Sequence, residues 1–208
     1  MAYTLYIIGI GPGHPDYMVP KGKEIIAKSS LIVASERALE DFALPGQDTY
    51  PVTGKLKELL AFVKAELERR DVVVLVSGDT GYYSLMTYLK KNITEHPIEV
   101  VAGISSMTFA FARLQESWFD ADLLSFHGRI PAEEKLYYEE GRKLGFLTDK
   151  EHNPAYIAKI LMEHGWPSTT RAAALTRLSY EDEQIVDATL ADLANLEGFE
   201  HAVTIVLG

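Results

Sequence analysis

The segment Val72–Val76 constrains the fold more than any other stretch of this 208-residue chain. All five of its residues are apolar and four are valine, so it favours an extended strand covered on both faces. A strand of that kind is typical of the middle of a parallel sheet, whose crossover connections are usually helices. The chain is therefore expected to alternate strands with helices.

The remaining chain repeats this alternation. Apolar residues between positions 56 and 67 recur with helical spacing, which predicts an amphipathic helix. Asn153 is a suitable N-cap before Pro154, and Gly165 with Pro167 would end the helix that begins there. Other strands are predicted at Leu5–Ile10, Leu31–Ala34, Ile98–Val101, Leu123–Phe126, Gly145–Leu147, Ala172–Thr176, Gln184–Ala188 and Ala202–Leu207. Other helices are predicted at Pro20–Ser29, Tyr82–Lys91, Ser105–Leu114 and Leu190–Leu196.

The two halves differ in how their strands are connected. Predicted crossover helices dominate the first half, whereas the closing strands follow one another as hairpins do. This predicts an α/β protein with a mostly parallel sheet in its first domain and a mixed sheet in its second. Apolar periodicity lapses between Arg113 and Asp120, so the domains are expected to span residues 1–115 and 116–208.

Three glycine-bearing loops directly follow predicted strands of the first domain. They are Gly9–Gly13, Ser77–Gly81 and Gly103–Ser106. The carboxyl ends of parallel strands lie at one edge of a sheet, where open α/β sheets bind ligands. Glycine lets a ligand approach the backbone, and Asp79 offers a carboxylate to a ribose hydroxyl or an ammonium group. Ser105 and Ser106 would open a helix, where hydroxyls and free N–H groups converge.

Each loop alone also has a simpler explanation, because glycine after a strand is usually a tight turn. Asp79 would then be a turn residue and Ser105 an ordinary N-cap. Three such loops in register favour a nucleotide-like ligand instead. Several familiar sites are excluded, because the first loop is not G-x-G-x-x-G and the chain has no G-x-x-x-x-G-K-[ST] motif. Gly103 and Ser105 also lack the following glycine of a nucleophile elbow.

Composition narrows the function further. The chain has no cysteine, which excludes disulfides, thiolate metal sites and a cysteine nucleophile. Its six histidines lack H-x-x-x-H spacing, so no catalytic metal is expected. A net charge of −10 argues against nucleic-acid binding and electrostatic membrane binding. No segment resembles a signal peptide or a membrane span, so a cytoplasmic protein is expected.

The tripeptide His127–Gly128–Arg129 follows the predicted strand Leu123–Phe126 and so projects from a strand end. A guanidinium group there suits a carboxylate-rich ligand, because it pairs with carboxylates in a bidentate manner. A surface turn with a solvated arginine explains the same residues equally well.

Taken in order, the three loops resemble those of the tetrapyrrole (corrin and porphyrin) methyltransferases. That family has G-x-G-P-G, G-D-P and P-G-x-S-S loops, and the corresponding segments are Gly9–Gly13, Ser77–Gly81 and Ala102–Ser106. The resemblance extends over essentially the whole chain, through His127–Arg129, Phe146–Asp149 and Ala188–Leu190. Thr80 and Ala102 replace the family's prolines, which affects the expected loop conformation more than the expected cofactor. Met18–Val19 replaces the family's Leu-Thr, so that contact is not carried over.

The resemblance implies two small α/β domains with the active site in the cleft between them, S-adenosylmethionine as methyl donor, and a homodimer. The residues that it implies for the cofactor are Pro12, Gly78, Asp79, Tyr82, Ser105, Ser106, Leu147, Ala174 and Thr204. Those expected at the substrate are Gly11, Gly13 and Arg129. The segments SGDTGYYS and HGR are most similar to those of family members that methylate carbon 5 of cobalt-precorrin-7 or precorrin-6Y in cobalamin biosynthesis. Such members work with a separate methylase–decarboxylase subunit that acts at carbon 15.

Methyl transfer from a sulfonium to an electron-rich ring carbon needs alignment more than it needs a protein nucleophile. A proton must leave the macrocycle, and His127 is the candidate base because imidazole titrates near neutrality. Arg113, Arg129 and Lys135 are candidate partners for substrate carboxylates. Two alternatives stay open: another methylase of the family, of the porphyrin or diphthine type, and a nucleotide-binding module without catalytic activity.

Overall fold

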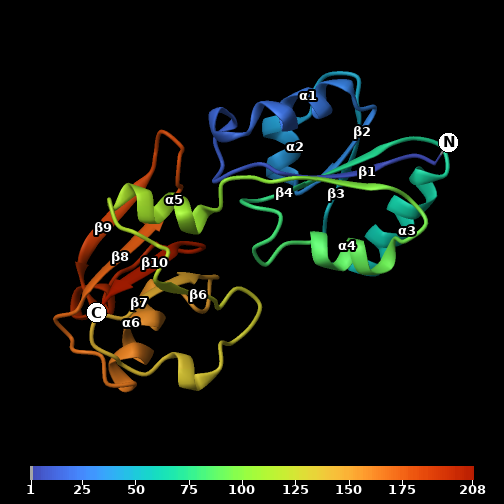
Figure 1. The fold of residues 1–208 in the computed structure, drawn as a ribbon. Coiled ribbons are helices and arrows are strands. Elements are labelled where there is room, and N and C mark those ends of the chain that lie inside the picture. Colours follow the sequence, from blue (N-terminus) through green and yellow to red (C-terminus); the bar gives the residue numbers. More distant parts are fainter. Residues whose placement is uncertain (1) are drawn as a thin grey trace. The chain divides into compact units, whose positions relative to one another are not determined.

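The structure, a computed structural model, describes residues 2–208 and forms two compact units, Met1–Ser105 and Ser106–Gly208. Each unit is built of helices packed on one β-sheet (Figure 1). The sequence placed the domain boundary after residue 115. The structure instead groups helix α5 (Ser106–Arg113) with the second unit, because it packs on strands of that unit. No helix among residues 2–208 is long and apolar enough to cross a membrane.

The first unit contains a five-stranded sheet in the order β3-β2-β4-β1-β5. Its strands are β1 (Leu5–Gly9), β2 (Leu31–Ala34), β3 (Asp48–Pro51), β4 (Val72–Val76) and β5 (Ile98–Val101). All neighbouring strands pair in parallel. The apolar segment Val72–Val76 is the central strand and all of its residues are buried, which confirms the prediction from its composition.

Helices cover both faces of this sheet. They are α1 (Pro20–Lys28), α2 (Glu36–Phe42), α3 (Leu56–Leu67) and α4 (Met86–Asn92), with a short 3-10 helix at Pro15–Tyr17. One cluster of buried residues joins Ile26 of α1 and Phe42 of α2 to one face of the sheet, and another joins Leu59 of α3 and Leu89 of α4 to the other face. The helix predicted from Tyr82 begins only at Met86, because Tyr83 has a φ of 51° that interrupts helical backbone geometry.

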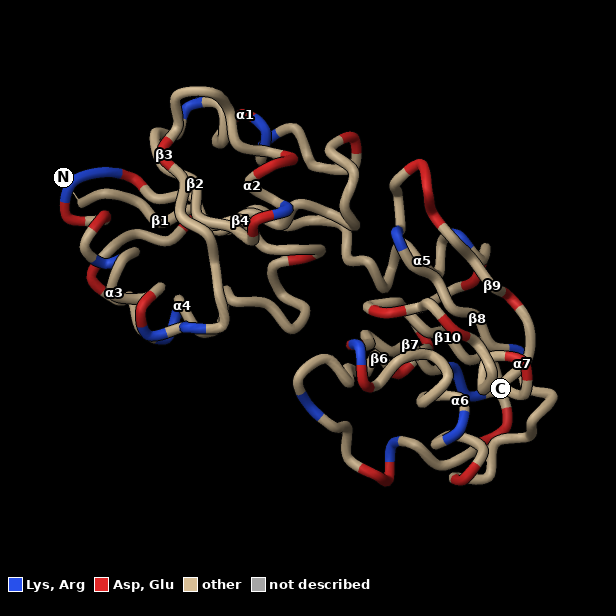
Figure 2. The backbone as a smooth tube through the Cα atoms, turned by 180° about the vertical axis from the view of Figure 1, so that it is seen from behind, with Lys and Arg blue, Asp and Glu red and all other residues tan. Residues whose placement is uncertain are grey.

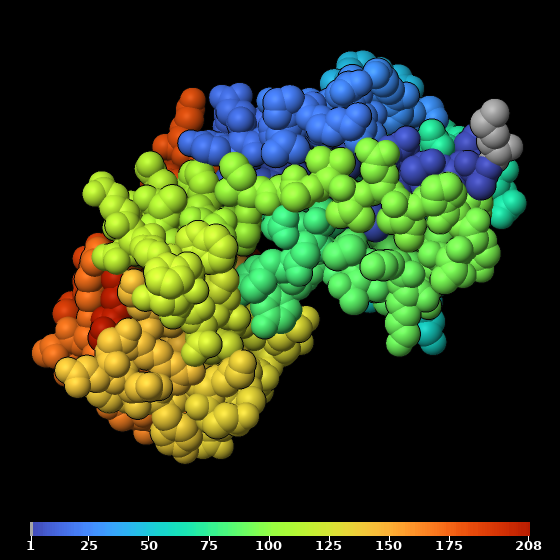
Figure 3. Space-filling model, viewed as in Figure 1, coloured from blue at the N-terminus to red at the C-terminus, as the bar shows by residue number. Residues whose placement is uncertain are grey.

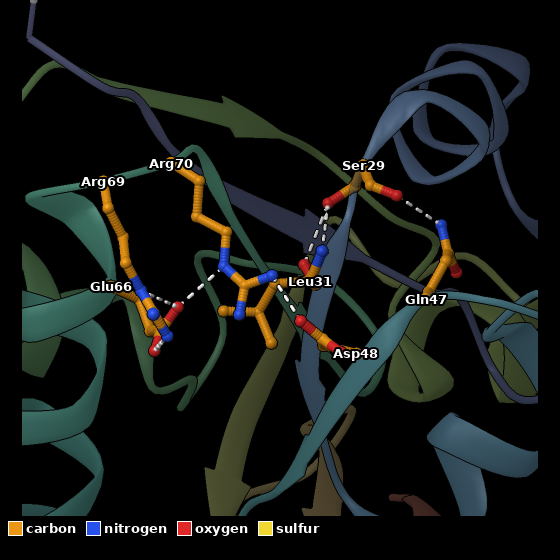
Figure 4. A network of polar contacts seen from close by, with 7 residues as sticks. All are labelled: Ser29, Leu31, Gln47, Asp48, Glu66, Arg69 and Arg70. Atoms are coloured by element: carbon orange, nitrogen blue, oxygen red, sulfur yellow. Dashed lines mark hydrogen bonds and ion pairs between the residues drawn. The ribbon is translucent and has the colours of Figure 1, made fainter.

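A polar network holds the amino-terminal edge of this sheet (Figure 4). Glu66, buried near the end of α3, accepts hydrogen bonds from Arg69 and Arg70, and the bond from Arg69 is the main reason that its pKa is lowered. Arg70 also donates to Asp48 on β3 at 2.5 Å. Gln47 donates to the carbonyl oxygen of Ser29, just beyond α1, at 2.8 Å. These bonds fasten the start of the strands to their helices.

The second unit contains a mixed sheet in the order β6-β7-β10-β8-β9. Its strands are β6 (Ala121–Ser125), β7 (Lys143–Leu147), β8 (Arg171–Thr176), β9 (Gln184–Thr189) and β10 (Val203–Leu207). Only β6 and β7 pair in parallel among these described strands. One face packs on α6 (Pro154–Glu163) and α7 (Leu190–Leu193), and α5 lies on the other, against Gly145. A short 3-10 helix spans Glu133–Lys135. The predicted mixed sheet is confirmed.

Candidate active site

The three glycine loops of the first unit pack directly on one another. The Gly11 N–H donates to the Gly78 carbonyl oxygen at 3.2 Å, and the Gly78 N–H donates to the Gly11 oxygen at 2.9 Å. A Cβ on Gly103 would lie 2.2 Å from the Gly78 oxygen and 2.7 Å from the carbonyl carbon of Gly9. Only glycine fits where these loops cross. The glycines expected to admit a ligand therefore first of all let three stretches of backbone meet.

Asp79 joins the central loop to the third loop. Its Oδ1 accepts from the Gly81 N–H at 2.8 Å, and its Oδ2 accepts from the Gly103 N–H at 3.2 Å. The first of these bonds is an ordinary turn contact, whereas the second spans 24 residues. The neighbouring Thr80 is buried, and its carbonyl oxygen accepts from the Ser84 hydroxyl. The central loop is thus fixed from within and bonded to its neighbour.

The other predicted cofactor residues of these loops are partly buried. Tyr82 is half-buried, and this burial raises the pKa of its phenol well above the ordinary value. The Tyr82 ring meets the exposed Tyr83 ring edge-on, with centroids 4.7 Å apart. Ser105 is buried at the end of the first unit, and Ser106 opens α5 in the second. Pro12 is half-exposed in the first loop.

A second carboxylate organises the loops of the second unit. Asp149, which follows β7, accepts from the backbone N–H groups of Glu151 at 3.0 Å and His152 at 2.7 Å. It also accepts from the Gly128 N–H at 3.4 Å and lies 3.1 Å from Nδ1 of the His152 ring. The hydrogen bonds from His152 and Gly128, led by that from the His152 backbone, lower the pKa of Asp149 to about 2. Sequence reasoning gave Asp149 no role.

The segment His127–Arg129 is held at its base and exposed at its tip. The His127 N–H donates to the buried Ser125 Oγ at 3.2 Å, and Asp149 binds the next N–H along. The side chains of His127 and Arg129 are exposed. The His127 ring also lies 6.1 Å from the ring of His201, which precedes β10 and was missed because no motif surrounds it.

The three predicted carboxylate partners differ in their surroundings. Arg113 is bound to Glu183 on the β8–β9 connection, with Nε to Oε1 at 2.7 Å. Arg129 and Lys135 are exposed, and so is Arg113. Basic residues are spread over both units rather than gathered on one element (Figure 2). Arg113 therefore fastens α5, and the role of all three residues as carboxylate partners stays a prediction.

The predicted cofactor residues Leu147, Ala174 and Thr204 lie in the second sheet. Thr204 on β10 pairs with Ala174 on β8 and Phe146 on β7, and all three are 0% exposed. They belong to the face covered by α6 and α7. Among the described residues, Oγ1 of Thr204 is the buried side-chain oxygen without a hydrogen-bond partner. Leu147 is half-buried at the end of β7. The cofactor roles of Leu147, Ala174 and Thr204 stay predictions.

A pocket of about 500 Å³ opens at the opposite edge of the first sheet. Its charged lining residues are Lys21, Glu24, Lys28, Arg70, Asp71 and Glu99. Opposite charges are equal in number, and Glu24 pairs with Lys28 at 2.6 Å. The lining therefore selects no ligand by charge. Within residues 2–208, no group of three or more His, Asp or Glu side chains is arranged to hold a metal ion.

Comparison with known proteins gives one consistent family. The model of the tetrapyrrole (corrin/porphyrin) methylases matches residues 4–194. The chain is 33% identical over 198 residues to a probable cobalt-precorrin-7 C(5)-methyltransferase of Methanocaldococcus jannaschii, covering 92% of each chain. It is 27% identical to a cobalt-precorrin-4 C(11)-methyltransferase of the same organism, covering 97% of this chain and 86% of that one. A uroporphyrin-III C-methyltransferase from Thermus thermophilus, solved with S-adenosyl homocysteine, has the same fold, with a TM-score of 0.80 at 22% identity over 98% of this chain and 96% of that one.

Proposed function

Because the chain belongs to the tetrapyrrole (corrin/porphyrin) methylases, we propose that it transfers a methyl group from S-adenosylmethionine to carbon 5 of a corrin precursor, cobalt-precorrin-7 or precorrin-6Y. Family membership makes the chain a methyltransferase. The choice of carbon 5 is supported by the archaeal relative whose name states that position. The choice of donor is supported by the first unit itself.

The hydrogen-bond partners of the loop N–H groups are the main support for the cofactor proposal. In phosphate-binding loops, backbone N–H groups point at the ligand and hold its negative charge. Here the N–H groups of Gly11 and Gly78 bind each other's carbonyls, and those of Gly81 and Gly103 bind Asp79. A carboxylate among occupied donors repels a phosphate and attracts a cation. S-adenosylmethionine has no phosphate and carries a positive sulfonium, so it suits these loops better than a nucleoside phosphate.

We assign the cofactor to the edge of the sheet that carries the loops. The proposed cofactor residues are Pro12, Gly78, Asp79, Tyr82 and Ser105, with Ser106 next along the chain. Tyrosine is protonated at neutral pH and burial raises the pKa of Tyr82 further, so its phenol is a hydrogen-bond donor by chemistry. Gly11 and Gly13 are proposed to face the substrate.

The second unit offers groups for the substrate. Bound S-adenosylmethionine would supply a methyl group that an electron-rich ring carbon can take directly, so the protein needs no nucleophile of its own. We propose that Arg129 pairs with a substrate carboxylate and that His127 accepts the proton that the macrocycle loses. Both side chains are exposed on a segment that Ser125 and Asp149 hold in place.

We also propose a homodimer and cooperation with a separate methylase–decarboxylase subunit that acts at carbon 15. The segment between α5 and β6 lies at the surface of the second unit (Figure 3). There Trp118 is 48% exposed and Phe119 is 83% exposed. Exposed aromatic side chains are typical of subunit interfaces, which supports an assembly.

Methylation of a different ring position is the second candidate. It is favoured by the 27% identity to a methyltransferase that acts at carbon 11. The two candidates share the cofactor and the fold and differ only in the substrate.

Offering purified protein one substrate at a time tests the proposal. Cobalt-precorrin-7, cobalt-precorrin-4 and uroporphyrinogen III would each be incubated with ¹³C-methyl-labelled S-adenosylmethionine, and the methylated carbon located by NMR. We expect label at carbon 5 of cobalt-precorrin-7 only. Label at carbon 11 of cobalt-precorrin-4 would show that the protein methylates carbon 11 instead of carbon 5. If calorimetry detects no binding of S-adenosylmethionine at millimolar concentration, the cofactor proposal is wrong.

A further inference from the structure

Both carboxylate oxygens of Asp79 are already engaged inside the protein. Oδ1 binds the Gly81 N–H at 2.8 Å and Oδ2 binds the Gly103 N–H at 3.2 Å. A carboxylate has about four lone-pair sites, so each oxygen keeps the capacity for a further hydrogen bond. The carboxylate spans the gap between two loops, so its geometry is that of a connector.

The first and third loops are joined to the central loop in different ways. Gly11 and Gly78 are joined by two backbone hydrogen bonds. Gly103 is placed by close packing against Gly9 and Gly78, and by its bond to Asp79. Each packed atom pair adds only about 0.1 to 0.2 kcal/mol of attraction. The bond from Asp79 adds a directed attraction that ties Gly103 to the central loop.

We propose that Asp79 is a positioning residue, which binds the cofactor indirectly by holding the third loop, and with it Ser105, at a fixed distance from the central loop. The proposal rests on the proposed function, since it concerns the same cofactor site. It differs from a direct contact in one measurable respect. A direct contact is lost only with ligands that carry the contacted group, whereas a displaced loop weakens every ligand of the site.

Calorimetry with a graded set of ligands separates the two roles. The variant Asp79→Asn keeps the side-chain shape but turns an NH2 group toward one of two N–H donors. The ligands are S-adenosylmethionine, S-adenosylhomocysteine, 5′-methylthioadenosine and the 2′,3′-dideoxy form of the last. They remove in turn the sulfonium charge, the amino-acid group and the ribose hydroxyls. We expect the variant to weaken the two uncharged ligands, 5′-methylthioadenosine and its dideoxy form, by about tenfold. S-adenosylmethionine should be weakened at least as much, because its sulfonium also loses the attraction of the carboxylate.

A matched control makes the same chemical change at the other edge of the sheet. Asp71 also binds a backbone N–H with its carboxylate, that of Thr4 at 2.7 Å. The variant Asp71→Asn should leave all four affinities unchanged. A loss in Asp79→Asn confined to ligands with an ammonium group, or to those with ribose hydroxyls, would show a direct contact and overturn the proposal.

Amide hydrogen exchange in the ligand-free wild type tests the connector without any variant. The Gly103 amide should exchange at least about tenfold more slowly than an unprotected amide. In Asp79→Asn this protection should be lost while the amides of β4 stay protected. Exchange of Gly103 at the unprotected rate in the wild type would contradict the proposal even if the variant failed to fold. If the wild type binds none of the four ligands, the proposed function fails, and the exchange rate still decides the role of Asp79 in the loops.

Discussion

The two units use the same device at the ends of their strands, but in different surroundings. Asp79 follows β4 and binds the N–H of Gly103, and Asp149 follows β7 and binds the N–H of Gly128. A Cβ on Gly103 would overlap backbone atoms, whereas a Cβ on Gly128 would meet nothing within 4 Å. The first junction is therefore packed as well as bonded, and the second is held by hydrogen bonds alone.

The hydrogen bonding compensates for that difference. Asp79 accepts from two N–H groups, whereas Asp149 accepts from three and also lies beside the ring of His152. Asp79 thus accepts fewer hydrogen bonds at a junction that is also packed, and Asp149 accepts more at a junction that is not. The first junction should thus be sensitive to added volume, and the second to a change in charge.

Alanine in place of each glycine should give the largest difference. We expect Gly103→Ala to lower the free energy of unfolding by about 3 kcal/mol or more, because its Cβ would lie 2.2 Å from the Gly78 oxygen. Gly128→Ala should lower it by about 1 kcal/mol, from its φ of 65° alone. Urea unfolding measures both, and equal losses would break the comparison.

Asparagine in place of Asp149 should give the next largest effect. The folded pKa of about 2 lies below the unfolded value of about 3.9, so ionisation favours the folded state above that unfolded value. We expect Asp149→Asn to lower the free energy of unfolding by about 1 to 2 kcal/mol at neutral pH. Since the benefit of the charge is lost as pH falls from about 4 to about 2, the difference between wild type and variant should shrink over that interval. A difference that stays constant from pH 6 to pH 2.5 would show that charge is not the cause.

Asparagine variants of the two aspartates should also differ in steady-state kinetics. We expect Asp149→Asn to raise the KM for the tetrapyrrole several-fold by releasing the segment that carries Arg129, with the affinity for S-adenosylmethionine unchanged. Asp79→Asn should weaken the affinity for S-adenosylmethionine and leave the KM for the tetrapyrrole unchanged. An equal effect of both asparagine variants on both ligands would remove the distinction between the units.

Removing a buried hydroxyl from the second unit should give the smallest effect. Oγ1 of Thr204 is buried without a hydrogen-bond partner, so Thr204→Val should raise the free energy of unfolding by about 0.5 to 1 kcal/mol. The matched variant Thr148→Val should lower it, because Oγ1 of Thr148 donates to the carbonyl of Ala202 at 2.7 Å. Thermal unfolding compares the two. A loss of cofactor affinity in Thr204→Val would give that residue the role predicted from the family resemblance.

Structural features that a short run of residues determines were predicted from the sequence. Features that depend on contacts between distant residues were not. The apolar run Val72–Val76 is enough to identify a central strand, and the glycine loops follow strands as expected. Strand β3 was missed because Asp48–Pro51 is mostly exposed and has no apolar alternation. Helix α2 was missed because it is short, although Ser35 caps it through the Ala38 N–H.

The chemistry of the loops shows the same limit. The sequence shows that Asp79 lies between glycines, but not that the Gly103 N–H reaches it from 24 residues away. The reason given for the glycines, close approach of a ligand, was incomplete for the same cause, since the crossing of Gly9, Gly78 and Gly103 exists only once the sheet has formed. The role of Asp149 depends likewise on a neighbouring strand.

The strand order of the first sheet has a consequence for synthesis on the ribosome. Strand β1 is the first to emerge, yet its two partners, β4 and β5, are the last strands of its unit. At common translation rates, roughly 3 to 13 s separate the synthesis of β1 from that of β4, the earlier of its two partners. During that interval the apolar residues Leu5–Ile8 have no strand to pair with in their final sheet. The nascent chain thus exposes these apolar residues early, at the stage when chaperones that bind extended apolar segments would act.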